Sequence, residues 1–300
     1  MFCSAAQDHT VRVWDVRSGS QRSLGIIGLQ SSSRYGSCPA SVEWSSNHLL
    51  VVAERNDTIH VYDVRKLNNS STSAAATTTT TLQQQSLSLR GRATPYQSYN
   101  LQPNVVEGCQ FSPNGDYLVA TTTLRGEGMG ELRIWKDGTN LDQPEPKERT
   151  TTTNDGVVFT YPGHTGPIYQ FCFSPDGKRL ATGGSDAIVG LWDVESMVCT
   201  NAITRRTKFI RSVSFSYDSK LVASSSEDDG IDLADASDGK LIGTVGLAAP
   251  SSSSLLSRRG GGGADEIAFH PNDQYLLACA RGDFLGMSAP VAIAKLNMSQ

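Results

Sequence analysis

The sequence predicts an all-β protein built from one repeated unit, and three observations support this prediction. A short segment of alternating residues that ends in an aromatic residue and an aspartate recurs along the 300 residues. A second kind of segment, with the pattern of a strand, a turn and another strand, precedes most of its copies. The spacing of the copies approaches a constant period wherever no polar tract lengthens it. We therefore expect a series of similar antiparallel sheets.

The aromatic-ended segments predict one strand in each unit. Their β-branched residues alternate with other residues, which is typical of a half-buried strand. The four clear copies are TVRVWDV (10–16), TIHVYDV (58–64), ELRIWKD (131–137) and AIVGLWDV (187–194). Two weaker copies keep the alternation without the aromatic residue: GIDLADA (230–236) and PVAIAKL (290–296).

The second kind of segment predicts two further strands in each unit. Ser-Pro-Asp-Gly or a related sequence stands between them, where proline presets φ and glycine tolerates positive φ. The five copies are SVEWSSNHLLVVA (41–53), GCQFSPNGDYLVAT (108–121), QFCFSPDGKRLATG (170–183), SVSFSYDSKLVASS (212–225) and EIAFHPNDQYLLAC (266–279).

The aromatic position recurs at residues 14, 62, 135, 192, 234 and 294, the last two being alanine, so the spacings are 48, 73, 57, 42 and 60 residues. The shortest spacing matches the period of about 40–45 residues of a β-propeller blade. The longer spacings contain extra residues, most of which lie in three tracts that are too polar to form a core: 66–100, 136–155 and 246–264. We predict one propeller domain over 1–300, with these tracts as low-complexity loop insertions.

Composition excludes several classes of function. A net charge of −4 argues against a dedicated nucleic-acid-binding protein. The six cysteines form no Cys-x-x-Cys pair, so we expect buried reduced thiols and no metal site. Neither a signal peptide nor an apolar run of 18 residues is visible, which favours an intracellular protein without membrane association. We expect no cofactor, and we interpret the basic cluster at 205–208 as a solvated loop rather than a nuclear-import signal.

The segment GHTGPIYQFCFSPDGKRLATGGSDAIVGLWDV (163–194) combines a Gly-His pair, a Ser-Pro-Asp-Gly turn, an aspartate before the last strand and Trp-Asp. With these residues it resembles the WD-repeat unit, which implies a WD-repeat β-propeller. A narrower resemblance follows from SDAIVGLWDVESMVC and the next unit, in which SSSEDDGIDLADA lacks Trp-Asp. This order of an intact and a degenerate unit is similar to the THO complex subunit 3 family.

The resemblance implies a non-catalytic scaffold subunit of the THO/TREX complex in the nucleus. Such a subunit couples transcription to mRNA packaging and nuclear mRNA export through protein–protein contacts. Its partners would be other THO/TREX subunits, with mRNA associated indirectly through the complex and no small-molecule substrate. Two alternatives stay open: another WD-repeat adaptor, such as a chromatin or ubiquitin-ligase receptor, and a propeller hydrolase.

The number of blades departs from that family, which is expected to have seven. Five segments predict an inner strand, whereas six predict the aromatic-ended strand, because residues 1–16 begin in the middle of a unit. We therefore expect about five to six blades of seven, with the amino-terminal part of the ring missing.

Two readings compete for the polar residues of the 163–194 unit. His164, Ser185 and Asp186 are residue types of a nucleophilic catalytic site. The WD-repeat resemblance instead implies a structural hydrogen-bond set of His164, in the loop entering the blade, with Thr182, Asp186 and Trp192. We favour the structural set, and we predict no catalytic residues.

Other units keep parts of this signature. Asp8 stands six residues before Trp14, as Asp186 does before Trp192, and Asn56 takes that place before Tyr62. We expect the aspartates that follow the aromatic positions to be strand-end or turn residues rather than ligands. The predicted repeat-signature residues are Asp8, Trp14, Asp15, Asn56, Tyr62, Asp63, Trp135 and Asp193.

Overall fold

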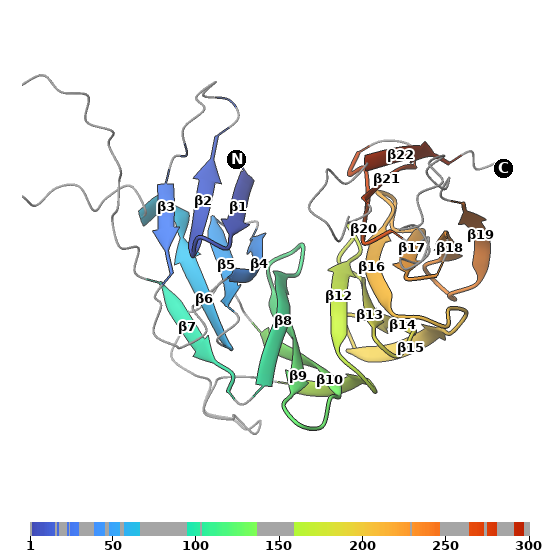
Figure 1. Cartoon of the computed structure of the whole chain (residues 1–300), viewed down its shortest axis with the longest axis horizontal. Helices are drawn as coiled ribbons and strands as arrows, with labels where there is room; N and C mark the ends of the chain where they lie inside the picture. Colours follow the sequence, from blue (N-terminus) through green and yellow to red (C-terminus); the bar gives the residue numbers. More distant parts are fainter. Residues whose placement is uncertain are drawn as a thin grey trace, which may run out of the picture.

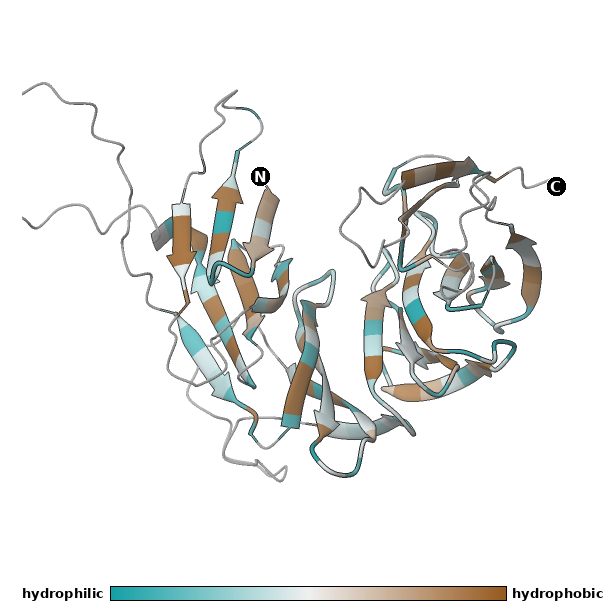
Figure 2. Ribbon diagram, viewed as in Figure 1, coloured by the Kyte–Doolittle hydropathy of each residue, from teal (hydrophilic) through white to brown (hydrophobic). Residues whose placement is uncertain are grey.

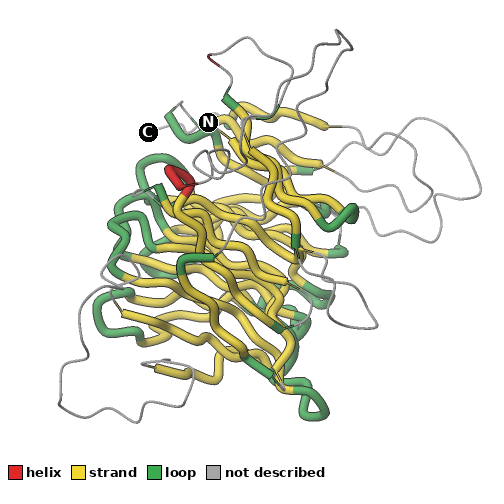
Figure 3. Tube along the Cα trace, turned by 90° about the vertical axis from the view of Figure 1, so that its left-hand side faces the viewer, coloured by secondary structure: helices red, strands yellow, loops and turns green. Residues whose placement is uncertain are grey.

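The computed structural model of the chain describes residues 2–15, 17, 23, 25–29, 39–45, 48–54, 57–66, 95–102, 104–136, 159–228, 230–246, 264–272, 275–280 and 291–296. Strands make up nearly all of the regular structure in these ranges, together with the short 3-10 helix η2 (Val64–Lys66), as Figure 3 shows. The all-β prediction is confirmed. Within the same ranges, the structure has no helix with the length and apolar character that a membrane crossing needs.

Six antiparallel sheets follow one another along the chain and stand in an arc (Figure 1). In chain order they are sheet one (β1-β2-β3), sheet two (β4 to β7), sheet three (β8 to β11), sheet four (β12 to β15), sheet five (β16 to β19) and sheet six (β20-β21-β22). The first strands of consecutive sheets contact one another from β4 to β20 and so form the inner side of the arc. Sheets one and six stand at its two ends, apart from each other in Figure 1.

Strands at the same position in different sheets share a role. The inner strands are β4 (Pro39–Trp44), β8 (Asn104–Phe111), β12 (Ile168–Phe173), β16 (Ile210–Phe215) and β20 (Glu266–Phe269). The second strands are β1 (Phe2–Ala6), β5 (Leu49–Glu54), β9 (Tyr117–Leu124), β13 (Arg179–Gly184), β17 (Leu221–Ser226) and β21 (Leu276–Ala280). The third strands are β2 (Thr10–Trp14), β6 (Thr58–Asp63), β10 (Gly130–Lys136), β14 (Val189–Asp193), β18 (Ile231–Asp235) and β22 (Val291–Lys295). The outer strands are β3 (Gly25–Gly28), β7 (Gln97–Asn100), β11 (Phe159–His164), β15 (Val198–Ile203) and β19 (Leu241–Val245).

The turn between the inner and second strands has the chemistry that the sequence predicts. In sheet four, Gly177 N–H donates to the Ser174 carbonyl at 2.8 Å, and Gly177 has a φ of +71°. The Ser174 hydroxyl donates to Asp176 Oδ1 at 2.6 Å, which closes the turn a second time. Serine hydroxyls make the corresponding contact at Ser112 in sheet three and Ser216 in sheet five. A shared turn therefore sets the register of these strand pairs.

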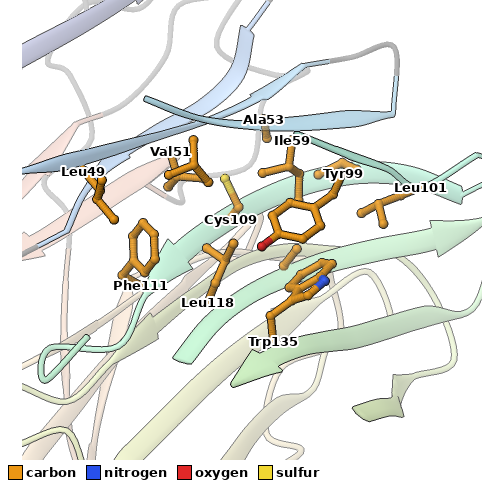
Figure 4. Close-up of a cluster of buried hydrophobic side chains, with 13 residues drawn as sticks. Leu49, Val51, Ala53, Ile59, Tyr99, Leu101, Cys109, Phe111, Leu118 and Trp135 are labelled. Atoms are coloured by element: carbon orange, nitrogen blue, oxygen red, sulfur yellow. The ribbon is translucent and has the colours of Figure 1, made fainter. Parts of the chain in front are cut away.

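Each pair of consecutive sheets encloses its own hydrophobic cluster. Figure 4 shows the cluster between sheets two and three. There Val51 and Ile59 of sheet two pack on Cys109, Phe111 and Trp135 of sheet three. Because each sheet buries its faces only against its neighbours, the stability of a sheet depends on the sheets beside it.

The predicted strands are confirmed, and so is the count of units. Within the described residues, six sheets have a third strand, whereas the inner strand is present in five and missing from sheet one. The outer strands could not be predicted from the sequence. Some of these strands mix polar with apolar residues, as β15 does with the sequence VCTNAI, and β3 has only four residues, GIIG, so they lack the alternation that marks a strand.

The first predicted insertion, 66–100, was too long. Its end contains β7, in which Tyr99 is buried and lies 5.0 Å from Trp135 between ring centroids. Two tyrosines at the end of a long polar segment give little signal, yet Tyr99 places this strand on the core. Residues 67–94, 137–158 and 247–263, which make up most of the three predicted insertions, lie outside the described residues.

Candidate functional site

The four side chains of the predicted hydrogen-bond set lie together where sheets three and four meet. His164 is the last residue of β11 in sheet three, and not part of a loop as expected. Thr182 and Trp192 lie on β13 and β14 of sheet four, and Asp186 lies in the turn between those strands. One residue of sheet three thus meets three residues of sheet four.

The four side chains form a continuous chain of hydrogen bonds. Asp186 Oδ1 lies 2.9 Å from His164 Nδ1, and His164 Nε2 lies 2.8 Å from Thr182 Oγ1. The Trp192 indole N–H donates to the same hydroxyl oxygen at 3.0 Å. With its proton on Nδ1, the histidine donates to the carboxylate and accepts the threonine proton at Nε2. This arrangement gives every donor in the chain an acceptor.

Burial raises the energetic importance of these bonds. Asp186 has the most exposed side chain of the four, at 10%. Its carboxylate also accepts the backbone N–H of Thr165 at 3.1 Å and that of Ile188 at 3.2 Å. A buried donor or acceptor that loses its partner costs about 1–3 kcal/mol, so each member depends on the others.

Two glycines provide the space that the hydrogen-bond set occupies. A Cβ atom at Gly184 would lie 2.6 Å from His164 Nδ1. A Cβ atom at Gly190 would lie 2.7 Å from Thr182 Oγ1 and 2.9 Å from Trp192 Nε1. Neither glycine was predicted to belong to the site. The sequence could have indicated them, because Gly184 stands two residues before Asp186 and Gly190 stands two residues before Trp192.

The arrangement offers no accessible nucleophile within the set. Thr182 is fully buried, and its hydroxyl proton is directed to His164. Asp186 and Thr182 engage both ring nitrogens of the histidine, so no base remains for Ser185. The Ser185 hydroxyl instead lies against Gly166. We propose that the set fastens sheet four to sheet three and that its role is structural.

Sheet one contains a partial version of the same set. Asp8 Oδ1 accepts the Thr10 N–H at 3.1 Å, and the Trp14 indole N–H donates to Ser4 Oγ at 3.0 Å. Arg12 occupies the position that glycine has in sheet four, and its Nη2 lies 2.8 Å from Asp8 Oδ2. The aspartate therefore pairs with a cation from its own sheet.

Sheets two and three keep only the aromatic residue of the set among the described residues. Tyr62 and Trp135 are 4% and 3% exposed, and Trp135 packs against Tyr99. Asn56 lies outside the described residues. The aromatic side chains are thus the component most often kept, because they fill the core between sheets.

The aspartates after the aromatic positions lie at the ends of the third strands: Asp63 and Asp193 are the last residues of β6 and β14, and Asp15 directly follows β2. Asp15, Asp63 and Asp193 each accept a backbone N–H two or three residues further along, at 2.9–3.0 Å. Hydrogen bonds from the side chain and the backbone of Ser196 hold the pKa of Asp193 below its ordinary value. Within the part of the chain that the structure describes, no three His, Cys, Asp or Glu side chains are grouped to bind a metal ion.

Sheet five replaces the hydrogen-bond set with an ion pair. The positions of the set and of Gly190 have equivalents 42 residues further along the chain, and four of the five carry a different residue type. In order, His164, Thr182, Asp186, Gly190 and Trp192 correspond to Arg206, Ser224, Asp228, Asp232 and Ala234.

The ion pair joins the two positions at which blade five has a charged residue and blade four does not have the same charge: Arg206 stands in place of His164, and Asp232 stands in place of Gly190. Arg206 Nη2 lies 2.7 Å from Asp232 Oδ1, and the Asp232 side chain is 2% exposed. Arg205 Nε lies 3.2 Å from Asp232 Oδ2, and the Thr244 hydroxyl donates to Asp232 Oδ1 at 2.8 Å. The interpretation of the 205–208 cluster as a solvated loop was therefore wrong for Arg206, whose side chain is 11% exposed. The fixed 42-residue offset is the signal that identifies its role.

Comparison with known proteins agrees with this geometry. The sequence model of the WD domain, G-beta repeat, matches residues 156–193 and 197–233, which contain the third strand of sheet four and the first part of the third strand of sheet five. The chain carries WD40 repeats. The six sheets are the blades of a WD-repeat β-propeller. A chain in a crystal structure of the mitotic checkpoint complex shares this fold, with a TM-score of 0.68 at 18% identity over 98% of this chain and 70% of that chain.

Two curated relatives span most of the chain. THO complex subunit 3 from Arabidopsis thaliana is 24% identical over 84% of this chain and 63% of its own length. WD repeat-containing protein AAC3 from Dictyostelium discoideum is 28% identical over 73% of this chain and 36% of its own length. This chain therefore spans less than two thirds of either relative.

Proposed function

We propose that this WD-repeat chain is a non-catalytic scaffold subunit of the THO/TREX complex in the nucleus. There it couples transcription to mRNA packaging and nuclear mRNA export through contacts with other subunits, and it associates with mRNA through the complex. The observation that carries this proposal is the extent of similarity to THO complex subunit 3. It covers 84% of the chain, whereas the repeat model matches only 156–193 and 197–233, so it extends well beyond these two repeats.

The fold supports a scaffold because the blades hold exposed side chains in fixed positions. Tyr169 is the second residue of the inner strand of blade four, and Phe209 precedes the inner strand of blade five. They are 36% and 41% exposed, with ring centroids 5.9 Å apart. Arg211 Cζ lies 5.2 Å from the Tyr169 ring centroid, and the guanidinium pairs with Glu227. Tyrosine and arginine in such fixed positions contribute much of the binding energy of protein interfaces.

Affinity purification of the tagged chain from nuclear extract tests the assignment. We expect recovery of THO subunits in near-equal amounts that nuclease treatment does not reduce. The variant Tyr169→Ala/Phe209→Ala should recover less of them, because the paired rings form part of the contact surface. Tyr217→Ala is the matched control, since Tyr217 is 38% exposed and packs instead against Tyr275.

A second candidate is a different WD-repeat adaptor, such as a chromatin or ubiquitin-ligase receptor. The higher identity of AAC3, 28% against 24% for THO complex subunit 3, favours it. Recovery of chromatin or ubiquitin-ligase subunits without THO subunits in the same purification would overturn the THO proposal and support this one.

A further inference from the structure

Two aromatic rings and an arginine gather where blades four and five meet, and we call these three residues the aromatic–arginine cluster. Tyr169 is the second residue of β12, Phe209 directly precedes β16, and Arg211 is the second residue of β16. Figure 2 shows hydrophilic segments alternating with hydrophobic ones along these two strands, which lie side by side. Blade three precedes this pair of blades and blade six follows it, so the cluster is not at an end of the arc.

The guanidinium of Arg211 uses only part of its hydrogen-bonding capacity. Its Cζ lies 5.2 Å from the ring centroid of Tyr169 and 5.9 Å from that of Phe209. Nη2 donates to Glu227 Oε1, and within the described residues the guanidinium has no other hydrogen-bond acceptor. Because a guanidinium carries five N–H donors, Arg211 can still donate to a carboxylate of another molecule.

The surface beside the rings presents positive charge, because the carboxylates there are less exposed than their cations. The side chain of Lys208 is 51% exposed and that of its partner Asp228 is 21% exposed. For Arg205 and its partner Asp232 the values are 53% and 2%. The backbone N–H groups of Thr207 and Lys208 donate to Asp228 Oδ2 at 2.9 and 3.3 Å, which holds this carboxylate against its own loop. A partner therefore meets the cations and the rings first.

We propose that the aromatic–arginine cluster binds an acidic segment of a partner protein. A carboxylate of the segment would accept hydrogen bonds from Arg211 and pair with Lys208, and an apolar side chain beside it would pack on the rings of Tyr169 and Phe209. Arginine–carboxylate hydrogen bonds are among the strong ones, and aromatic rings are common anchors of interfaces. The inference rests on the proposed scaffold function, in which the same two rings contact another subunit.

Single-stranded RNA fits this surface less well than an acidic peptide does. RNA carries a phosphate at every nucleotide, so its binding depends on a row of cations along the strand. Here Arg205, Lys208 and Arg211 each already pair with a carboxylate of the chain. A peptide needs to place only one carboxylate at Arg211, so the charges favour the peptide.

The probe is a fluorescent synthetic peptide, Glu-Glu-Leu-Phe-Glu-Glu, and its binding to the whole chain is measured by fluorescence anisotropy. We expect saturable binding, which Arg211→Gln should weaken more than about tenfold, because the charge-assisted hydrogen bonds are lost. Lys208→Glu, at an exposed loop position, should weaken it about threefold. Lys220→Glu is the matched control: Lys220 is 77% exposed beyond the other end of β16, and its reversal should leave peptide affinity unchanged.

A second peptide, with glutamine in place of every glutamate, separates charge from apolar contact and should bind more than about tenfold more weakly. Absence of binding by the acidic peptide, equal binding of the glutamine peptide, or unchanged affinity of both Arg211→Gln and Lys208→Glu would overturn the proposal. Displacement of the acidic peptide by single-stranded oligouridine would show that RNA occupies the surface, which also contradicts it.

The affinity purification described above separates this inference from the THO assignment. Recovery of THO subunits by a chain that does not bind the acidic peptide would contradict only the partner chemistry. Peptide binding by a chain that recovers no THO subunits would contradict only the THO assignment.

Discussion

The Thr182 hydroxyl is the junction of the hydrogen-bond set. It accepts the indole N–H of Trp192 and donates to His164, and it is fully buried. Thr182→Val keeps the shape of the side chain but leaves both partners unpaired, so we expect the free energy of unfolding to fall by about 2 kcal/mol. Thr182→Ser keeps the hydroxyl and serves as the control. Equal stability of the two variants in urea denaturation would contradict this role.

The space at Gly190 gives a second prediction at the residue scale. Gly190→Ala places a methyl group within 3 Å of Thr182 Oγ1 and Trp192 Nε1, so we expect a loss of about 1–3 kcal/mol. Gly243→Ala on β19 is the matched control, because no atom lies within 4 Å of its Cβ position. Thermal denaturation compares the two. A Gly190→Ala variant as stable as Gly243→Ala would show that the set tolerates the added atom.

Cysteine reactivity distinguishes buried thiols from an exposed one. Burial raises the pKa of both Cys109 and Cys172 to about 12. At pH 8 about one thiol in ten thousand is then ionised, so neither cysteine should react with iodoacetamide in the folded chain. Cys199 is exposed and should be modified. Peptide mass spectrometry reads each site, and rapid modification of Cys109 or Cys172 would contradict their placement.

At the scale of elements, blades four and five pair the equivalent polar positions at the interface with the preceding blade in two different ways. The buried ion pair of Arg206 and Asp232 replaces the set that contains Trp192, and Ala234 takes the place of the tryptophan. An aspartate at position 232 fits there because the indole that would occupy the space is absent. The degenerate blade therefore has a buried ion pair of arginine and aspartate, where the intact blade has a chain of hydrogen bonds that runs from a carboxylate through histidine and threonine to tryptophan.

A double-mutant cycle tests this replacement. Arg206→Leu leaves a buried carboxylate without its nearest cation, so we expect a loss of about 3 kcal/mol in the free energy of unfolding. Adding Asp232→Leu should restore part of that loss, because no uncompensated charge remains. Arg205→Leu is the control: its side chain is 53% exposed, and such a pair contributes less than about 1 kcal/mol. Additive effects in the cycle would exclude a coupled pair.

Inner, second and third strands were predictable from sequence because their burial follows the alternation of their residues. The outer strands were not, since half of each faces solvent and its side chains can be polar. The same limit applies to His164, which sequence analysis placed in a loop although it ends the outer strand β11. Arg206 was missed for a different reason: only the alignment of one blade on the next shows that an arginine stands where a histidine is expected.

At the scale of the molecule, the chain is a series of blades joined by one hydrophobic cluster at each interface. The hydrogen-bond set lies at the interface of blades three and four and adds polar contacts to the apolar cluster there. Fixed geometry between neighbouring blades is what a scaffold needs, because it presents several side chains to a partner without further ordering. We therefore propose that the hydrogen-bond set has a structural role and not a catalytic one.

The structural role is tested most directly by equilibrium unfolding of two variants, His164→Ala and Ser185→Ala. Loss of the imidazole leaves Asp186 and Thr182 without their shared partner, so the free energy of unfolding should fall by about 1–3 kcal/mol. Ser185→Ala should change it by less than about 0.5 kcal/mol, because its hydroxyl has no part in the set. A His164→Ala variant as stable as the unmodified chain would contradict a structural role of the hydrogen-bond set.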